Sequence, residues 1–81
     1  WNDAQGSIRL DRMQARLAVR QGRYERAWEL LRNIERLEGL TAQEQALLAI
    51  AARETGRTEE FPEARKKALQ MGVDVSELKS R

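Results

Sequence analysis

The sequence predicts an all-α fold in which antiparallel helical hairpins stack on one another. The five glycines stand at positions 6, 22, 39, 56 and 72, so neighbouring glycines are 16 or 17 residues apart. Glycine adopts a positive φ without steric cost and commonly ends a helix. Two intervals together give 33 or 34 residues, a period typical of helix–turn–helix repeats. With one proline and many Ala, Leu, Glu and Arg residues, helix propensity is high along the whole chain.

Composition restricts the function classes. The chain has 81 residues and a net charge of +2, with neither cysteine nor histidine. Disulfides, thiol chemistry and most transition-metal sites are therefore excluded. The sequence also contains no glycine-rich phosphate loop and no nucleophile–base set, so we predict no enzymatic activity and no cofactor. The longest apolar run, 46–52, is too short to insert in a membrane, where a helix needs about 20 residues.

Residues 7–21 are predicted to form the first helix, capped by the Ser7 hydroxyl and ended by Gly22. Its apolar side chains occupy two flanks, with Leu10, Leu17 and Ala18 on one and Ile8, Ala15 and Val19 on the other. A helix with two apolar flanks is expected to lie between neighbours. The second helix, 24–37, carries apolar residues at three- and four-residue spacing. Its Trp28 and Leu31 are expected to be buried between the first and third helices.

The second hairpin follows the same plan. Thr41 and Glu44 form a capping-box pattern that predicts the start of a third helix, which runs to about Thr55. Pro62 fits the first turn of a fourth helix, which begins near 60–62 and ends at Met71, before Gly72. Residues 75–81 are predicted to begin a further helix.

The segment 17–31 resembles the middle of a tetratricopeptide repeat. In that family a small residue lies in the first helix, and a Gly, an aromatic residue and an Ala mark the turn and the second helix. The matching residues here are Ala15 and Ala18, then Gly22, Tyr24 and Ala27. The second copy keeps Leu48, Ala49, Ala52, Gly56 and Ala68, and at an offset of 34 residues Ala15 falls on Ala49, Ala18 on Ala52 and Gly22 on Gly56. The resemblance implies a single right-handed solenoid domain with repeat one at about 8–39 and repeat two at about 41–72.

The second copy departs from the family pattern in several places. Thr58 stands where the aromatic residue is expected, and Phe61 where the small residue is expected. The chain also opens on Trp1 without an initiator Met. We therefore expect a segment of a longer, soluble protein, either cytoplasmic or periplasmic, which can associate with itself through its terminal helices.

Four arginines of the first helix form the main candidate binding surface. Arg9, Arg12, Arg16 and Arg20 follow a three- and four-residue spacing, which places them on one stripe. The resemblance implies that this stripe faces a concave groove that binds extended peptides or partner helices. The predicted groove residues are Arg9, Arg12, Met13, Arg16, Arg20, Gln43, Leu47, Ile50 and Arg53.

Guanidinium groups form bidentate hydrogen bonds with carboxylates, so an acidic protein or peptide is the expected partner. The first alternative is a solvated helix face, partly paired with Asp11 and nearby glutamates. A second is that these repeats only extend a longer bacterial superhelical array, such as an envelope export or secretion component, and bind nothing themselves. Nucleic-acid binding is not expected, because the net charge is low and no exposed aromatic residues alternate with the arginines.

Overall fold

The computed structural model describes residues 4–75, and the side chains from residue 8 onward. Within that range the chain forms four helices and no strand: α1 (Ala4–Arg20), α2 (Tyr24–Leu37), α3 (Ala42–Glu54) and α4 (Glu60–Gln70). The predicted all-α class is confirmed. Of the further helix predicted at 75–81, residues 76–81 lie outside the described part of the chain.

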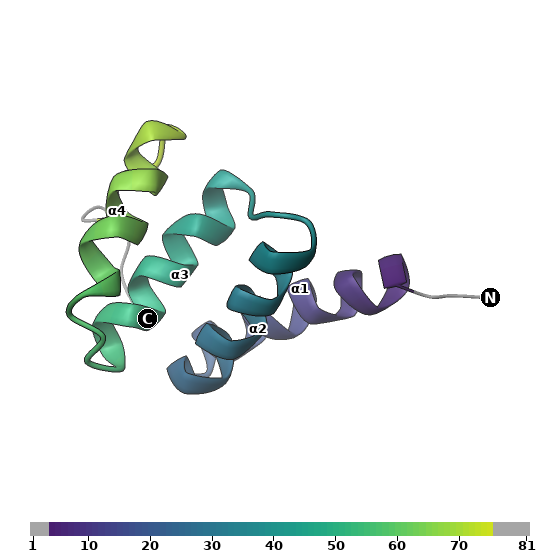
Figure 1. The fold of residues 1–81 in the computed structure, drawn as a ribbon. Helices are drawn as coiled ribbons and strands as arrows, with labels where there is room; N and C mark the ends of the chain where they lie inside the picture. Colours follow the sequence, from purple (N-terminus) through teal and green to yellow (C-terminus); the bar gives the residue numbers. More distant parts are fainter. Residues whose placement is uncertain (1–3, 76–81) are drawn as a thin grey trace.

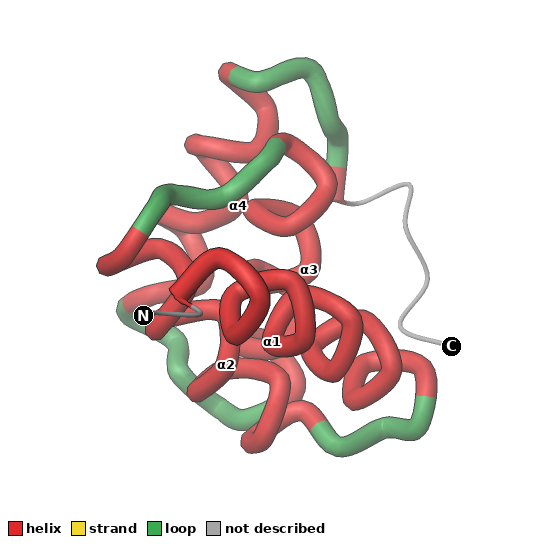
Figure 2. Tube along the Cα trace, turned by 90° about the vertical axis from the view of Figure 1, so that its right-hand side faces the viewer, coloured by secondary structure: helices red, strands yellow, loops and turns green. Residues whose placement is uncertain are grey.

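Consecutive helices pack against each other as two antiparallel hairpins, α1–α2 and α3–α4. Figure 1 shows α2 and α3 side by side in the middle of the molecule, with α4 on one side and α1 on the other. Figure 2, from a direction turned by 90°, also separates α4 from α1. The molecule is elongated, with principal extents of 41 × 26 × 20 Å. Its two end helices, α1 and α4, do not contact each other.

Glycine ends the helices as predicted. Helices α1, α2 and α3 end at Arg20, Leu37 and Glu54, each two residues before a glycine with positive φ. The turn after α1 is closed by a hydrogen bond from the Arg23 N–H to the Ala18 carbonyl at 2.7 Å. The turn after α3 repeats this bond from Arg57 to Ala52 at 2.9 Å. These bonds satisfy carbonyl groups that the last helical turn leaves free.

The two predicted N-caps differ in outcome. Thr41 forms the predicted capping box, because its side chain accepts a hydrogen bond from the Glu44 N–H while the Glu44 side chain accepts one from the Thr41 N–H. The prediction that Ser7 caps the first helix is wrong, since α1 already begins at Ala4 and includes Gly6.

The core is formed mainly by leucine, isoleucine and alanine side chains of α2 and α3. Leu31, Ile34 and Ile50 are almost completely buried. The small residues Ala49 and Ala52 of α3 have no exposed surface, which permits close approach of the neighbouring helices. The prediction that both apolar flanks of α1 are covered is wrong: Ile8, Ala15, Ala18 and Val19 are buried, whereas Leu10 and Leu17 are about half exposed.

Trp28 corrects a second expectation. It is half-buried rather than buried, and it packs at the edge of the core. Leu31, predicted to be buried with it, is completely buried.

Candidate protein-binding groove

A hollow lies between α1 and α3 and brings together four of the nine predicted groove residues. It has a volume of ≈ 410 Å³ and is lined by Arg16, Val19 and Arg20 from α1 and by Gln43 and Leu47 from α3. Because α1 and α3 hold equivalent places in the two hairpins, residues 23 to 31 positions apart in sequence meet here. We call this hollow the α1–α3 groove.

The α1–α3 groove combines an apolar floor with cationic sides. Val19 is buried and Leu47 is half-buried, whereas Arg16, Arg20 and Gln43 are exposed. Neither Arg16 nor Arg20 forms an ion pair with any residue that the structure describes. Their guanidinium groups can therefore form hydrogen bonds with an incoming carboxylate without breaking an existing ion pair.

Arg12, the second arginine of the stripe, forms hydrogen bonds within the chain. Its guanidinium donates hydrogen bonds to Glu44, to the Glu38 Oε1 at 3.1 Å and to the Gly39 carbonyl at 3.3 Å. The hydrogen bond to Glu44 is the main cause that raises the pKa of Arg12, while partial burial acts in the opposite direction. Arg12 therefore connects α1 to the α2–α3 turn and to the start of α3, instead of lining the groove as a free cation.

Glu44 is the partner of Arg12, and the sequence did not predict this contact. The sequence assigned it only a capping role, but its side chain is almost fully buried and accepts hydrogen bonds from both Thr41 and Arg12. Its second oxygen, Oε2, has no hydrogen-bond partner among the described protein atoms. The signal was present: Glu44, Leu47 and Ala51 follow three- and four-residue spacing on the side of α3 that packs against the first hairpin.

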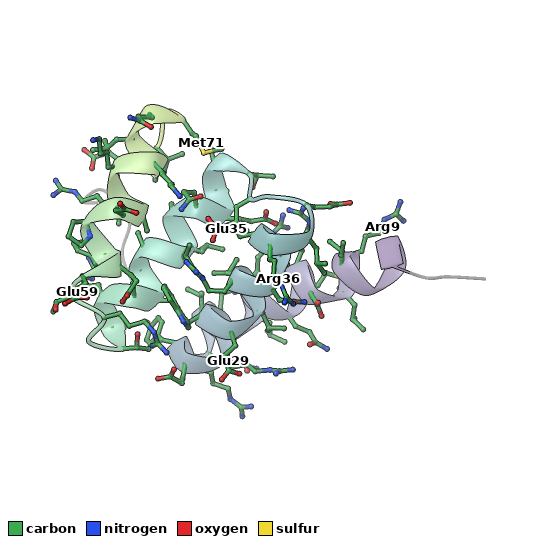
Figure 3. The ribbon with its side chains drawn as sticks, viewed as in Figure 1. Arg9, Glu29, Glu35, Arg36, Glu59 and Met71 are labelled. Atoms are coloured by element: carbon green, nitrogen blue, oxygen red, sulfur yellow. The ribbon has the colours of Figure 1, made fainter. Side chains whose placement is uncertain are left out.

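The remaining predicted groove residues lie elsewhere. Ile50 is 1% exposed and belongs to the core, so its predicted place on the binding surface is wrong. Arg53 is exposed and bonded to the neighbouring Glu54 at 3.3 Å. Met13 and Arg9 are exposed on α1 but do not line the α1–α3 groove, and Figure 3 shows Arg9 near the protruding start of this helix.

A second hollow lies at the other side of α1. It has a volume of ≈ 260 Å³ and is lined by Gln14, Leu17, Ala18, Gln21, Arg23 and Arg26. Leu17 is 49% exposed, and the neighbouring Leu10 and Met13 are 53% and 66% exposed. The sequence placed Leu10 and Leu17 in the interior, so it did not predict this surface.

The third surface surrounds Trp28 on α2. The Arg57 guanidinium lies 4.6 Å and the Arg32 guanidinium 5.3 Å from the centre of the indole ring, within the range of cation–π attraction. Arg57 also donates a hydrogen bond to Glu25 at 2.6 Å, which lowers the pKa of that carboxyl. The hollow beside Trp28 mixes both signs of charge, since Glu29, Glu35 and Arg36 lie along the same helix (Figure 3).

Residues 4–75 contain no group of three acidic side chains that could hold a metal ion. Among the same residues, no helix combines the length and the apolar character needed to cross a bilayer. The chain matches no protein-family model, and comparisons with curated proteins and with solved structures find no match either.

Proposed function

We propose that this chain is a protein-interaction module that binds an acidic peptide or helix in the α1–α3 groove. One observation carries the proposal: Arg16 and Arg20 are exposed without an ion-pair partner among the described residues, and they flank the apolar floor of Val19 and Leu47. An apolar floor supplies binding free energy by burial, and the planar guanidinium groups orient a bound carboxylate through bidentate hydrogen bonds.

The partner chemistry follows from this arrangement. A ligand that fits has an apolar side chain for Leu47 and carboxylates spaced to reach Arg16 and Arg20, which stand one helical turn apart. The Gln43 amide offers both a donor and an acceptor to a peptide backbone. Since Arg12 is held by Glu38 and Glu44, the binding surface is smaller than the full arginine stripe.

We also propose that the two hairpins are tetratricopeptide-like repeats of a right-handed solenoid. The support is the 34-residue offset between Gly22 and Gly56. The hydrogen bonds that close the two turns, from Arg23 to Ala18 and from Arg57 to Ala52, are related by the same offset. The alternative function is a spacer in a longer array. The engagement of Arg12 inside the chain favours it, because that arginine stabilises helix packing rather than an exposed site.

Fluorescence anisotropy tests the binding proposal. The probe is a labelled peptide with leucines between pairs of glutamates, and its matched control has lysine in place of each glutamate. We expect only the acidic peptide to bind, with an affinity that falls as salt rises because exposed charges are screened. Arg16→Glu with Arg20→Glu should reduce its affinity by about tenfold or more.

The control variant is Arg36→Glu with Lys66→Glu, which reverses two exposed charges outside the groove and should retain binding. Equal affinity of the acidic peptide for the wild type and for the Arg16→Glu, Arg20→Glu variant would overturn the proposal. The spacer function would then be preferred.

A further inference from the structure

The exposed apolar stripe of α1 points to a second interaction surface, separate from the α1–α3 groove. Leu10, Met13 and Leu17 follow three- and four-residue spacing and are each about half exposed or more. The hollow beside them is formed by Leu17 together with Arg23. We call Leu10, Met13, Leu17 and Arg23 the acceptor face.

The molecule itself contains a covered version of the acceptor face. At the 34-residue offset, Leu10, Met13 and Leu17 correspond to Glu44, Leu47 and Ala51 of α3. In α3 this face lies against the first hairpin: Ala51 is completely buried in a cluster with Ala18, Val19 and Ala27, and Leu47 packs on that cluster. The occupant of such a face is therefore a helical hairpin.

A charge pair accompanies that covered face. The Arg57 guanidinium, after α3, donates a hydrogen bond to the Glu25 carboxylate at the start of α2. The residues that correspond at the same offset are Arg23 and Glu59. Both are exposed, and neither forms an ion pair with any other residue between 4 and 75. The chain thus has both residues of a second possible ion pair, Arg23 and Glu59, but they are not paired with each other.

These two residues belong to different hairpins, since Arg23 lies between α1 and α2 and Glu59 directly precedes α4. Figure 3 shows Glu59 where the chain enters α4, while α1 lies on the far side of α2 and α3 (Figures 1 and 2). Pro62 and Leu69 of α4, three and ten residues after Glu59, are exposed. At the offset they correspond to Trp28 and Glu35 of α2, which face α3 and α4. We call Glu59, Pro62 and Leu69 the donor face.

We propose that a second copy of this chain docks its donor face on the acceptor face, so that copies associate head to tail with Glu59 of one copy bound to Arg23 of the next. The contact is inferred by analogy with the first hairpin on α3, where Arg57 is bound to Glu25, and the charges of Glu59 and Arg23 are likewise complementary. The donor and acceptor faces are different surfaces, so the contact does not close into a symmetric dimer and can continue from copy to copy. Its small apolar area predicts weak association that depends on concentration.

Sedimentation velocity over a concentration series tests this proposal. We expect the average mass of the wild type to rise with concentration up to about 1 mM, the range of weak contacts. Leu10→Gln with Leu17→Gln should abolish the rise and leave the circular-dichroism spectrum unchanged, since both side chains are half exposed. Leu37→Gln is the matched control, because Leu37 is 57% exposed on α2 outside both faces and should leave association unchanged.

A charge exchange between two chains identifies the contact. Glu59→Lys alone and Arg23→Glu alone should each remain monomeric, because each places like charges at the contact. An equal mixture of the two variants should associate again, since each donor face then meets an acceptor face of opposite charge.

Three results would overturn the proposal: a wild type that stays monomeric throughout the series, association that survives Glu59→Lys, or a mixture that fails to recover. Survival in Glu59→Lys would point instead to symmetric pairing of α1 helices. The acidic-peptide assay on Arg16 and Arg20 gives an independent result, because neither arginine belongs to the donor or acceptor face.

Discussion

At the residue scale, the ion pair between Arg12 and Glu44 separates two roles within one arginine stripe. A buried carboxylate that loses its cationic partner keeps the cost of desolvation without the compensating attraction. Glu44 is 1% exposed, and Arg12 is its only charged partner among the described residues. Arg12 is therefore a stabilising residue, whereas Arg16 and Arg20 are candidates for binding.

We predict that Arg12→Met destabilises the chain by about 1 to 3 kcal/mol, because it leaves Glu44 buried without a cation. Chemical denaturation of the wild type, Arg12→Met, Glu44→Gln and the double variant measures the coupling. Glutamine retains the N3 role in the capping box, so Glu44→Gln isolates the charge. The double variant should lose less than the sum of the single losses. Strict additivity would contradict an energetic role for this pair.

The sequence predicted the arginine stripe, but it did not predict that Arg12 is paired within the chain while Arg16 and Arg20 are unpaired among the described residues. The spacing of Arg9, Arg12, Arg16 and Arg20 placed all of them on one side of a helix, and local spacing treats them as equivalent. Which arginine is neutralised depends on Glu44, 32 residues further along the chain. That contact depends on how the two hairpins pack, and the helical periodicity of α1 alone does not predict this packing.

At the element scale, the glycines act as helix terminators only where the backbone requires positive φ. Gly22 has a φ of +78°, and a Cβ at that position would meet no atom within 4 Å. The constraint is therefore conformational and not steric crowding by neighbours. Gly6 lies inside α1, where an L-residue is favoured.

We predict opposite outcomes for the same substitution at these two glycines. Gly22→Ala should destabilise the chain by roughly 1 to 2 kcal/mol, because it forces alanine into the left-handed region. Gly6→Ala should be neutral or stabilising by up to about 1 kcal/mol, because alanine has the higher helix propensity. Thermal unfolding followed by circular dichroism measures both. A stable Gly22→Ala variant would show that the turn adopts another conformation.

The prediction of element boundaries succeeded where a specific hydrogen bond marks the boundary. Thr41 has both reciprocal bonds of the capping box, and α3 begins directly after it. Ser7 has the residue type of a cap, but Ala4 and Gln5 before it are good helix formers and α1 extends through them. A cap residue therefore predicts a helix start reliably only when the residues before it cannot themselves continue the helix.

At the scale of the whole molecule, the sequence predicted the class, the number of complete helices and most of the core. It did not predict the exposure of Leu10 and Leu17 or the half-burial of Trp28. An apolar flank indicates that a helix can be buried on that side. Whether it is buried depends on which other helix packs against it. Helices α2 and α3 have neighbours on both sides, whereas α1 and α4 stand at the ends of the row (Figure 1).

The position of a residue relative to neighbouring helices also predicts how much stability is lost when its side chain is replaced by alanine. Leu31 of α2 is completely buried, in the cluster that joins both hairpins, whereas Leu37 of the same helix is 57% exposed. Leu31→Ala should cost about 2 to 5 kcal/mol, since it removes buried apolar contacts and leaves a cavity. A domain of this size has a total stability of only about 5 to 10 kcal/mol, so the loss should be visible as a large decrease in the denaturation midpoint. Leu37→Ala should change stability by no more than about 0.5 kcal/mol. Equal losses for the two variants would mean that Leu37 is covered in solution, and that α2 contacts an element beyond the described residues.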